Sequence, residues 1–585
     1  MSKENKIQGK AFDVNILRRV LSYVKPYRGK FILSLSMVIC LSALSVSRPI
    51  IIQITIDKYI LTGNVGMLQM MTMLLIGIVL TEAILQLSNI YLTSFLGMSI
   101  VKDMRNQVYR HLLKMKNKYF DNTPIGTLVT RSVSDIESLG EVFSEGFIII
   151  FGDILTLCVF LVVMLAINLK LSLLALATVP ILIFATAIFK KGVKTSFQAV
   201  RNAVSALNTF VQEHITGIKI VQVFNREKTE SEEFKKINET HRKANIKGIW
   251  FYSVFFPVVE ILSSISIGLV IMFIGIIKGV SEGNIIFFVM IVQMFFRPIR
   301  MLADRINTLQ MGMVASDRVF KVLDTQEIIV DEGNDKPSEI KGEIEFKNVW
   351  FAYNEEDWVL KNVSFKVNAG QTFALVGATG SGKTSVINLL GRFYELNKGE
   401  IFLDGKNIRE YDLGFLRSRI GTVLQDVFLF SDTVKNNITL FDDSIPLEKV
   451  KTAANEIGAN DFIDQLPESY NFNIRERGNT LSVGQRQMIS FLRAYVHNPS
   501  ILVLDEATSS IDTETEILIQ KATEKMTRGR TSVVIAHRLS TIQKANKIIV
   551  MEKGTIIEEG NLAELLEKNG HFRKLYELQF VENNV

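Results

Sequence analysis

The sequence predicts an α-helical polytopic membrane domain followed by an α/β domain of the P-loop type. Three observations support this fold class: long apolar runs in the N-terminal half, a glycine-rich loop between an apolar strand and a helix, and a second apolar strand that ends in two acids. A chain of 585 residues is also too long for one hydrophobic core. We therefore expect a membrane domain over residues 1–320, a linker over 321–342 and the α/β domain over 343–585.

Six apolar segments are each long enough to cross the ~30 Å hydrocarbon layer of a membrane as a helix of about 20 residues. Any one of them could be a buried helix of a soluble protein, but six in succession favour a membrane domain. We place the spans at 31–55, 68–95, 146–168, 171–190, 249–277 and 284–303.

Lysine and arginine side chains predict the orientation of these spans. The N-terminal segment and the stretches 96–145 and 191–248 are basic, whereas the three short connections between spans are nearly free of such charge. By the positive-inside rule, both termini and the two long loops are cytoplasmic. The loops have helical patterns, so we expect the spans to have long cytoplasmic extensions. The family resemblance described below, together with the absence of a recognisable organelle-targeting extension, implies the plasma membrane of a bacterium.

Charge and cysteine content exclude several classes of function. The formal net charge is +6, and most of the excess basic charge lies beside the apolar runs, where membrane orientation accounts for it. We therefore expect no nucleic-acid partner. The only cysteines, Cys40 and Cys158, both lie within apolar runs, which supports neither a disulfide framework nor a cysteine metal cluster.

The segment "TFALVGATGSGKTS" contains an apolar strand, a glycine turn and the start of a helix. Its core fits the P-loop pattern G-x-x-x-x-G-K-[ST], in which backbone N–H groups cradle phosphate oxygens and the lysine neutralises β/γ charge. The last hydroxyl of the pattern, Thr384, ligates Mg²⁺ in such loops. We predict nucleotide contacts from Gly377, Gly380, Ser381, Gly382, Lys383, Thr384 and Ser385.

The second acidic element is "SILVLDEATSS", a buried strand that ends in two carboxylates. Asp505 is the candidate to hold the Mg²⁺ shell, and Glu506 is the candidate to polarise the attacking water. A strand capped by solvated acids is the simpler interpretation, but the P-loop upstream disfavours it. Together the two elements predict a P-loop ATPase domain that uses ATP and Mg²⁺.

The order of these motifs resembles an ABC exporter half-transporter of the multidrug type, and the resemblance covers nearly the whole chain. In that family a six-span domain is fused to a nucleotide-binding domain. The resemblance implies that Tyr353 stacks on adenine, although a core tyrosine is an alternative. It also implies that Gln425 contacts Mg²⁺ and water, that His537 is a catalytic residue that contacts the γ-phosphate, and that Asp512 lies at the end of the D-loop.

The stretch "LSVGQRQ" matches the family's signature, which is usually LSGGQ and binds ATP held by the partner's P-loop. Ser482, Gly484 and Gln485 remain in place, at the start of a helix that favours phosphate. Val483 departs from the pattern, since its branched side chain restricts φ and adds two methyl groups close to the phosphate. We expect a heterodimer with a second half-transporter, in which the Val483 site turns over slowly. A homodimer that tolerates Val483 is the alternative.

Two cytoplasmic segments resemble the family's coupling segments, where the membrane domain meets the nucleotide-binding domains. They are residues 118–137 and 215–228. The resemblance implies that the second reaches across to the partner subunit. Ordinary amphipathic helices would have the same periodicity.

Ionisable residues within the spans are candidates for the substrate pathway, because an unpaired charge in a membrane is costly. Glu82, Asp153 and Glu260 have this position and could act as counter-charges to lipophilic cations. Alternatively, Arg48 pairs with an acid, or the acids line water. We predict export of hydrophobic or amphipathic compounds by alternating access. A lipid flippase is the alternative, and an ATP-gated pore or a regulatory ATPase would be a different class.

Overall fold

The computed structural model describes residues 14–274, 281–329, 331–354, 357–505, 513–536 and 539–577. The chain divides into two compact units. The first unit comprises Met1–Leu113 and Pro124–Gln326, and the second comprises Lys114–Thr123 and Glu327–Val585. A short part of the connection after α3 therefore groups with the C-terminal half of the chain.

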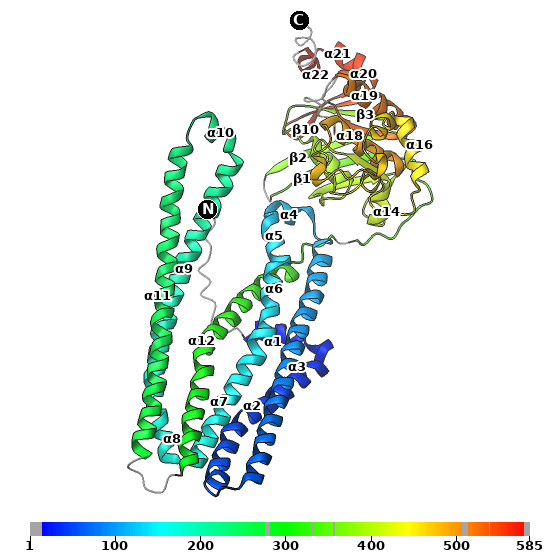
Figure 1. Ribbon diagram of the computed structural model, residues 1–585. Helices are drawn as coiled ribbons and strands as arrows, with labels where there is room; N and C mark the ends of the chain where they lie inside the picture. Colours follow the sequence, from blue (N-terminus) through cyan, green and yellow to red (C-terminus); the bar gives the residue numbers. More distant parts are fainter. Residues whose placement is uncertain are drawn as a thin grey trace. The chain divides into compact units, whose positions relative to one another are not determined.

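The first unit is helical (Figure 1). Its α-helices are α1 (Val14–Ser22), α2 (Arg28–Thr55), α3 (Val65–Leu112), α5 (Ile125–Ser132), α6 (Ser134–Glu141), α7 (Ile148–Ile167), α8 (Leu169–Ala175), α9 (Val179–Thr216), α10 (Ile218–Val223), α11 (Glu227–Ile274) and α12 (Glu282–Asp324). Six helical stretches are long and apolar enough to cross a membrane: Lys25–Ile60, Val65–Leu112, Ile125–Ile167, Leu169–Thr216, Glu227–Phe273 and Glu282–Met301. The predicted membrane fold class is confirmed.

Helices α9 and α11 lie side by side and are joined by the short helix α10 (Figure 1). Within the apolar part, the rings of Phe189 and Phe255 stack with centroids 4.0 Å apart. The first half of α11 is polar instead and carries ion pairs three residues apart, such as Arg242 with Glu239 at 2.7 Å. Each helix therefore continues from an apolar span into a solvated extension, as the sequence predicted.

The second unit contains two β-sheets. Strands β1 (Ile344–Ala352), β2 (Trp358–Val367), β4 (Lys398–Leu403) and β5 (Lys406–Asn407) form an antiparallel sheet in the order β2-β1-β4-β5. Strands β3 (Thr372–Val376), β6 (Ile420–Val423), β7 (Ile501–Asp505), β8 (Thr531–Ile535), β9 (Lys547–Glu552) and β10 (Thr555–Gly560) form the other sheet in the order β10-β9-β3-β8-β7-β6. All of its neighbours except β10 and β9 pair in parallel.

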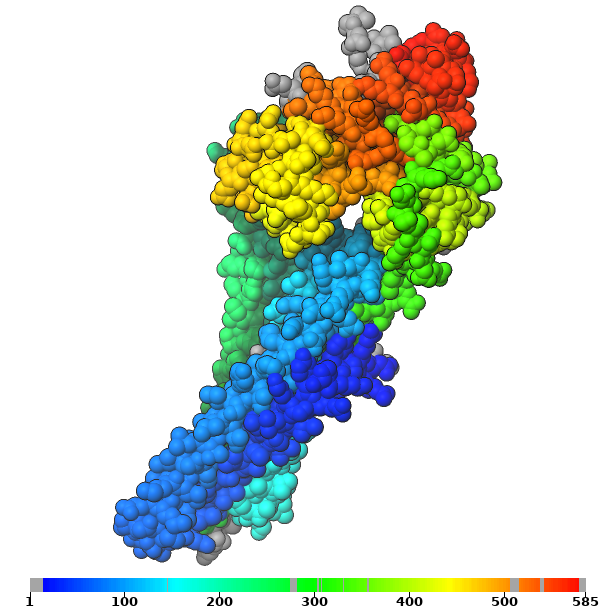
Figure 2. All heavy atoms as spheres, turned by 90° about the vertical axis from the view of Figure 1, so that its right-hand side faces the viewer, coloured from blue at the N-terminus to red at the C-terminus, as the bar shows by residue number. Residues whose placement is uncertain are grey.

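Helices surround these sheets in the second unit. They are α4 (Asn117–Asn122), α13 (Lys383–Leu390), α14 (Leu413–Ser418), α15 (Val434–Thr439), α16 (Leu447–Ile457), α17 (Asn460–Asp464), α18 (Val483–Val496), α19 (Thr513–Thr527), α20 (Leu539–Lys544), α21 (Leu562–Glu567) and α22 (His571–Tyr576). One apolar core fills the space between the two sheets and α13. A second core lies under α15 to α19 and supports a helical lobe, seen in yellow in Figure 2.

The segment between the two units was predicted as a linker over residues 321–342. Helix α12 continues into it and ends at Asp324. Asp335, farther along, is held on the second unit: its N–H donates to the carbonyl of Glu410 at 3.2 Å, and Lys406 pairs with its carboxylate at 2.5 Å. The later part of this segment therefore packs on the α/β domain.

Candidate functional site

The predicted ATPase motifs gather at one edge of the parallel sheet. Parallel strands end at the same edge, where loops collect the functional side chains. Strand β3 leads into the P-loop, β7 ends at Asp505, and β6 ends two residues before Gln425. Strand β8 ends two residues before His537. The topology thus brings together motifs that lie more than a hundred residues apart in the sequence.

The glycines of the P-loop occupy positions that other residues would fill badly. Gly382 has φ +104°, and a Cβ there would lie 2.7 Å from Leu360. A Cβ at Gly377 would lie 2.2 Å from the carbonyl oxygen of Met551. Gly380 has φ +82°, and a Cβ there would meet no described atom within 4 Å. The loop is thus packed tightly on its inner side and is open at Gly380, on the side where a phosphate would approach.

Lys383 begins α13 and turns back across this loop. Its ammonium donates hydrogen bonds to the carbonyls of Gly377, at 2.7 Å, and Ala378, at 3.0 Å. The side chain is buried, and burial lowers the pKa of Lys383, while the charge of Asp505 acts in the opposite direction. A phosphate would add further negative charge beside this buried ammonium.

Three hydroxyls near the start of α13 have different surroundings. The Ser381 hydroxyl is buried and has no hydrogen-bond partner among the described residues, so it is available to a ligand. Thr384 is exposed, whereas the buried Ser385 lies 3.1 Å from the Tyr353 hydroxyl. A hydroxyl such as that of Thr384 and a carboxylate such as that of Asp505, at the end of β7, are oxygen donors of the kind that fits Mg²⁺, which keeps several of its waters. Among the described residues, no group of three or more His, Cys, Asp and Glu side chains is placed to hold a metal ion.

The Tyr353 side chain is anchored in the α/β domain. Its ring packs edge-on against Phe351 and Tyr394, with centroids 4.7 and 5.0 Å away, and Asn388 donates to its hydroxyl at 3.3 Å. The ring is partly exposed, so it combines features of a core tyrosine with a free face. Stacking on adenine stays a prediction. Gln425 is exposed.

The signature segment forms the N-terminus of α18. Ser482 is the N-cap: its hydroxyl accepts from the Gln485 N–H at 3.1 Å, and the Gln485 side chain accepts from the Ser482 N–H at 2.9 Å. Val483 is the first helical residue, does not have a positive φ and is 47% exposed. The restricted φ of valine is therefore compatible with this backbone, and the distinguishing feature of Val483 is its bulk. The S-x-x-Q spacing of a capping box signalled this helix start in the sequence.

Three predicted site residues lie outside the described residues. They are Glu506, Asp512 and His537. Their roles stay predictions.

Each predicted acid of the membrane spans lies beside an arginine. Arg48 pairs with Glu82 and Arg305 pairs with Asp153, each from another helix, while Arg300 lies 3.9 Å from Glu260. Of these arginines, only Arg48 was predicted as a partner of an acid. The spacing of residues within one helix does not predict a partner on another helix. The idea that the acids are uncompensated counter-charges loses support.

The first predicted coupling segment is split between the two units. Residues 114–123, which include α4, group with the second unit, where the Lys116 N–H donates to the Glu327 carbonyl at 2.8 Å. The Tyr394 hydroxyl donates to the Asp121 carboxylate. The second coupling segment includes α10, and no residue of α10 is buried.

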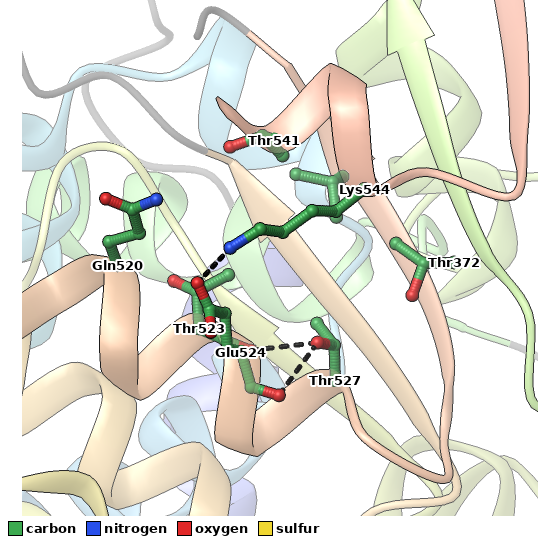
Figure 3. A pocket seen from close by; sticks show the side chains of 8 residues that line it. Thr372, Gln520, Thr523, Glu524, Thr527, Thr541 and Lys544 are labelled. Atoms are coloured by element: carbon green, nitrogen blue, oxygen red, sulfur yellow. Dashed lines mark hydrogen bonds and ion pairs between the residues drawn. The ribbon is translucent and has the colours of Figure 1, made fainter. Parts of the chain in front are cut away.

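A small polar cavity of about 60 Å³ lies between α19 and α20 (Figure 3). Glu524 and Lys544 form an ion pair at its side, and the Thr527 hydroxyl donates to the Thr523 carbonyl at 2.9 Å. None of the predicted nucleotide contacts lines it. Its size suits a water or two rather than a nucleotide.

Comparisons with known proteins agree with this architecture. Residues 31–299 match the ABC transporter transmembrane region, and residues 360–509 match the ABC transporter domain. The uncharacterized ABC transporter ATP-binding protein YknV of Bacillus subtilis (strain 168) is 37% identical, over 98% of this chain and 96% of the relative. An ATP-dependent lipid A-core flippase of Syntrophus aciditrophicus (strain SB) is 35% identical over 98% and 96%.

A third relative is named for drug resistance. It is the "Probable multidrug resistance ABC transporter ATP-binding/permease protein YheH" of Bacillus subtilis (strain 168), 36% identical over 86% of this chain and 76% of its own length. The solved structure of a bacterial Atm1-family ABC exporter with ATP bound has the same fold, with a TM-score of 0.77 at 23% identity, over 94% of this chain and 98% of that chain. The chain therefore belongs to the ABC transporter family and carries the membrane region and the ATPase domain of an exporter on one polypeptide.

Proposed function

We propose that this chain is one half of a dimeric, ATP-driven exporter of hydrophobic or amphipathic compounds in the bacterial plasma membrane, with both termini in the cytoplasm. The observation that carries the proposal is the open P-loop with its buried lysine, on the same polypeptide as six apolar helices. The relatives include a probable multidrug resistance transporter and an ATP-dependent lipid A-core flippase, which supports a compound of this class as the substrate.

The nucleotide chemistry follows from the edge of the parallel sheet. Backbone N–H groups of the P-loop and the ammonium of Lys383 bind the phosphates of ATP. Thr384, Asp505 and Gln425 would hold Mg²⁺, which would neutralise the charge that develops on the phosphates. Glu506 polarises the attacking water and His537 contacts the γ-phosphate, both on the family resemblance. Tyr353 offers its free face to adenine, and Asp512 stands at the subunit boundary.

Two exposed apolar surfaces support a dimer. The tip formed by α10 and its neighbours exposes large apolar side chains, with Ile220, Val223 and Phe224 each more than half exposed. The second unit exposes an aromatic cluster in which Phe430 contacts Phe428 and Phe441, with ring centroids 5.3 and 5.8 Å away. Exposed apolar patches of this kind mark interaction sites. We infer that α10 of each subunit docks on this aromatic cluster of the other.

The altered signature favours an asymmetric dimer. In the proposed assembly, the P-loop of this chain faces an intact signature of a second half-transporter and hydrolyses ATP there. Val483 is the first residue of the helix whose N-terminus would bind the other ATP, and it is exposed. Its methyl groups would occupy space next to the phosphate. That site binds ATP and turns over slowly. A homodimer with two Val483 sites is the competing assembly.

Lipid transport is the second candidate function, supported by the 35% identity to a lipid A-core flippase. Both functions would use the same ATPase domain, so the class of compound that stimulates the ATPase distinguishes them. Drugs that stimulate the enzyme favour the multidrug reading, and particular lipids that do so without a drug response favour the flippase. Ion currents in a bilayer would instead indicate a gated pore, and regulated hydrolysis without any transported compound would indicate a regulatory ATPase.

The deciding experiment is to purify this chain alone into lipid discs and to measure its mass and its ATPase rate. Glu506→Gln is the control for contaminating activity. A dimer with Glu506-dependent turnover would establish the homodimer. A monomer, or an inactive dimer rescued by a co-expressed half-transporter, would establish the asymmetric assembly. Turnover that survives Glu506→Gln in both settings would overturn the proposed catalytic role.

A further inference from the structure

A histidine joins the two long helices on either side of the coupling helix α10. His214 lies in the last turn of α9, and Glu230 lies in the first turn of α11. The Nε2 atom of His214 is 2.9 Å from the Glu230 carboxylate. The contact therefore joins the C-terminal end of α9 to the N-terminal end of α11, the two helix ends that flank α10.

Both ring nitrogens of His214 face hydrogen-bond acceptors. Nδ1 lies 2.8 Å from the backbone carbonyl oxygen of Phe210, and Nε2 faces the Glu230 carboxylate. Neither acceptor can donate a proton. A neutral imidazole carries one N–H and can satisfy only one of these contacts, whereas an imidazolium donates to both. The geometry therefore fits the charged form of His214.

Two further features favour that charge. The His214 ring stacks on Phe210, with centroids 3.8 Å apart and planes 15° from parallel, and an aromatic face attracts a cation. His214 also lies at the C-terminus of a 38-residue helix, where the helix dipole favours positive charge. In agreement, the hydrogen bond to the Phe210 carbonyl, followed by that to Glu230, raises the pKa of His214, against the opposing effect of desolvation.

The other charged groups around His214 do not replace its link. Glu213, on the same helix, adds negative charge that favours the imidazolium. Arg226, between α10 and α11, lies 3.4 Å from the other oxygen of Glu230. Arg226 and Glu230 are both on the α11 side of the hairpin, so their contact does not tie α9. Among the described residues, the His214–Glu230 contact is the ion pair that joins the two helix ends across α10.

Helix α10 has little else to hold it. It has six residues, none of them buried, and its large side chains face outward. Its position therefore depends on the two helix ends that flank it. When His214 and Glu230 hold these two helix ends together, α10 is ordered. When the contact is lost, α10 can move relative to α9 and α11.

We propose that His214 is a positioning residue whose protonation holds α10 ready for coupling, so that the link between ATP turnover and transport loosens as the cytoplasmic pH rises. The proposal rests on the proposed role of α10 as a coupling segment. The sign follows from linkage: a group with a raised folded-state pKa contributes fully below its ordinary pKa, and the contribution is lost as the pH rises through the raised value. The His214–Glu230 contact is therefore formed at mildly acidic pH and is lost toward alkaline pH.

The structural test is hydrogen exchange of the amides of residues 217–226 in the full-length chain in lipid discs, corrected for the intrinsic pH dependence of exchange. We expect protection to fall between about pH 6 and pH 8.5 in the unchanged chain. In His214→Lys, which stays charged over this range, protection should persist. In His214→Gln it should be low throughout. Protection that is independent of pH, or equal in the unchanged chain and His214→Gln, would overturn the proposal.

The matched control is His241→Gln. His241 lies farther along α11, and its Nε2 contacts Asn245 at 2.9 Å rather than a carboxylate. This variant should reproduce the pH profile of the unchanged chain. A profile flattened by His241→Gln would assign the pH dependence to another group and contradict the role of His214.

The functional test measures dye transported per ATP hydrolysed in proteoliposomes, with the partner chain present if the assembly is heterodimeric. We expect this ratio to fall at least about twofold between pH 6 and pH 8 in the unchanged protein and to change little in His214→Lys. An equal fall of this ratio in both proteins would contradict the proposed role of the His214–Glu230 contact. A lack of Glu506-dependent ATPase at every pH would instead contradict the proposed function, so the two failures are distinguishable.

Discussion

The Tyr394 hydroxyl donates a hydrogen bond to the Asp121 carboxylate, although 273 residues separate them in the chain. Asp121 lies on α4, in the short loop segment that groups with the α/β domain. The Tyr394 ring also packs edge-on against Tyr353, whose hydroxyl contacts Ser385 beside the P-loop. A continuous set of contacts therefore runs from the predicted nucleotide site to helix α4.

Tyr394→Phe should weaken coupling while leaving the basal ATPase close to that of the unchanged protein. The variant keeps the ring contact with Tyr353 and loses only the hydrogen bond to Asp121. We expect drug stimulation of the ATPase to fall about fivefold, equivalent to about 1 kcal/mol for one hydrogen bond. The measurement is ATPase rate against drug concentration in lipid discs.

Asp121 offers a matched pair of controls for that hydrogen bond. Asp121→Asn retains an oxygen that accepts from Tyr394 and should keep most of the stimulation, whereas Asp121→Ala should resemble Tyr394→Phe. Stimulation that is unchanged in both Tyr394→Phe and Asp121→Ala would show that the contact carries no coupling.

Thr384→Ala should raise the Mg²⁺ concentration needed for half-maximal ATPase and lower the maximal rate by about a hundredfold, the usual cost of removing one charge-stabilising group. Thr384 is exposed, and its hydroxyl is a proposed metal ligand together with the Asp505 carboxylate. Thr384→Ser keeps the hydroxyl and should stay within a few-fold of the unchanged enzyme. Equal Mg²⁺ dependence in the Ala and Ser variants would remove Thr384 from the metal shell.

Local patterns predicted much of this molecule. The six spans follow from hydropathy over about 20 residues, and the P-loop follows from the spacing of Gly377, Gly382 and Lys383. Contacts between distant segments could not be predicted in the same way, because no local pattern carries them. Arg305 beside Asp153, and Tyr394 beside Asp121, depend on how helices and domains pack.

Val483 shows how the local backbone refines a prediction from sequence. The sequence predicted that this valine restricts φ and adds bulk where glycine is usual in the family's signature. The capping box of Ser482 and Gln485 instead starts a regular helix, and Val483 takes a backbone conformation open to any residue. Its effect on function must therefore come from side-chain bulk.

Val483→Gly should accelerate the site that contains it. Removing two methyl groups opens the helix N-terminus to phosphate, at a cost to α18 of about 1 kcal/mol or less, because the residue is half exposed. We expect a higher ATPase rate of the assembled complex and a loss of the difference between its two sites, measured by nucleotide trapping at each site. Val483→Ala, with a single methyl, should fall between the two. Rates that do not differ among the three proteins would mean that Val483 has no mechanistic meaning.

Arg305→Met should destabilise the membrane unit. The Asp153 side chain is largely buried in the unchanged protein, and the substitution leaves its carboxylate without the arginine that pairs with it. Leaving a charged group unpaired in this way costs about 1–3 kcal/mol, and the double variant Arg305→Met/Asp153→Asn should recover much of the loss. Glu260→Gln is the matched comparison: its side chain is mostly exposed and its contact with Arg300 is longer, at 3.9 Å, so little stability should be lost. Thermal unfolding in lipid discs measures all three variants. A double variant that is no more stable than Arg305→Met alone would show that the pair does not hold the helices together.

Substrate recognition by Glu260 is tested separately, by measuring efflux of cationic and neutral dyes in Glu260→Gln. Selective loss of efflux of the cationic dyes would mean that the exposed Glu260 carboxylate contacts the transported molecule, even though Arg300 lies near it.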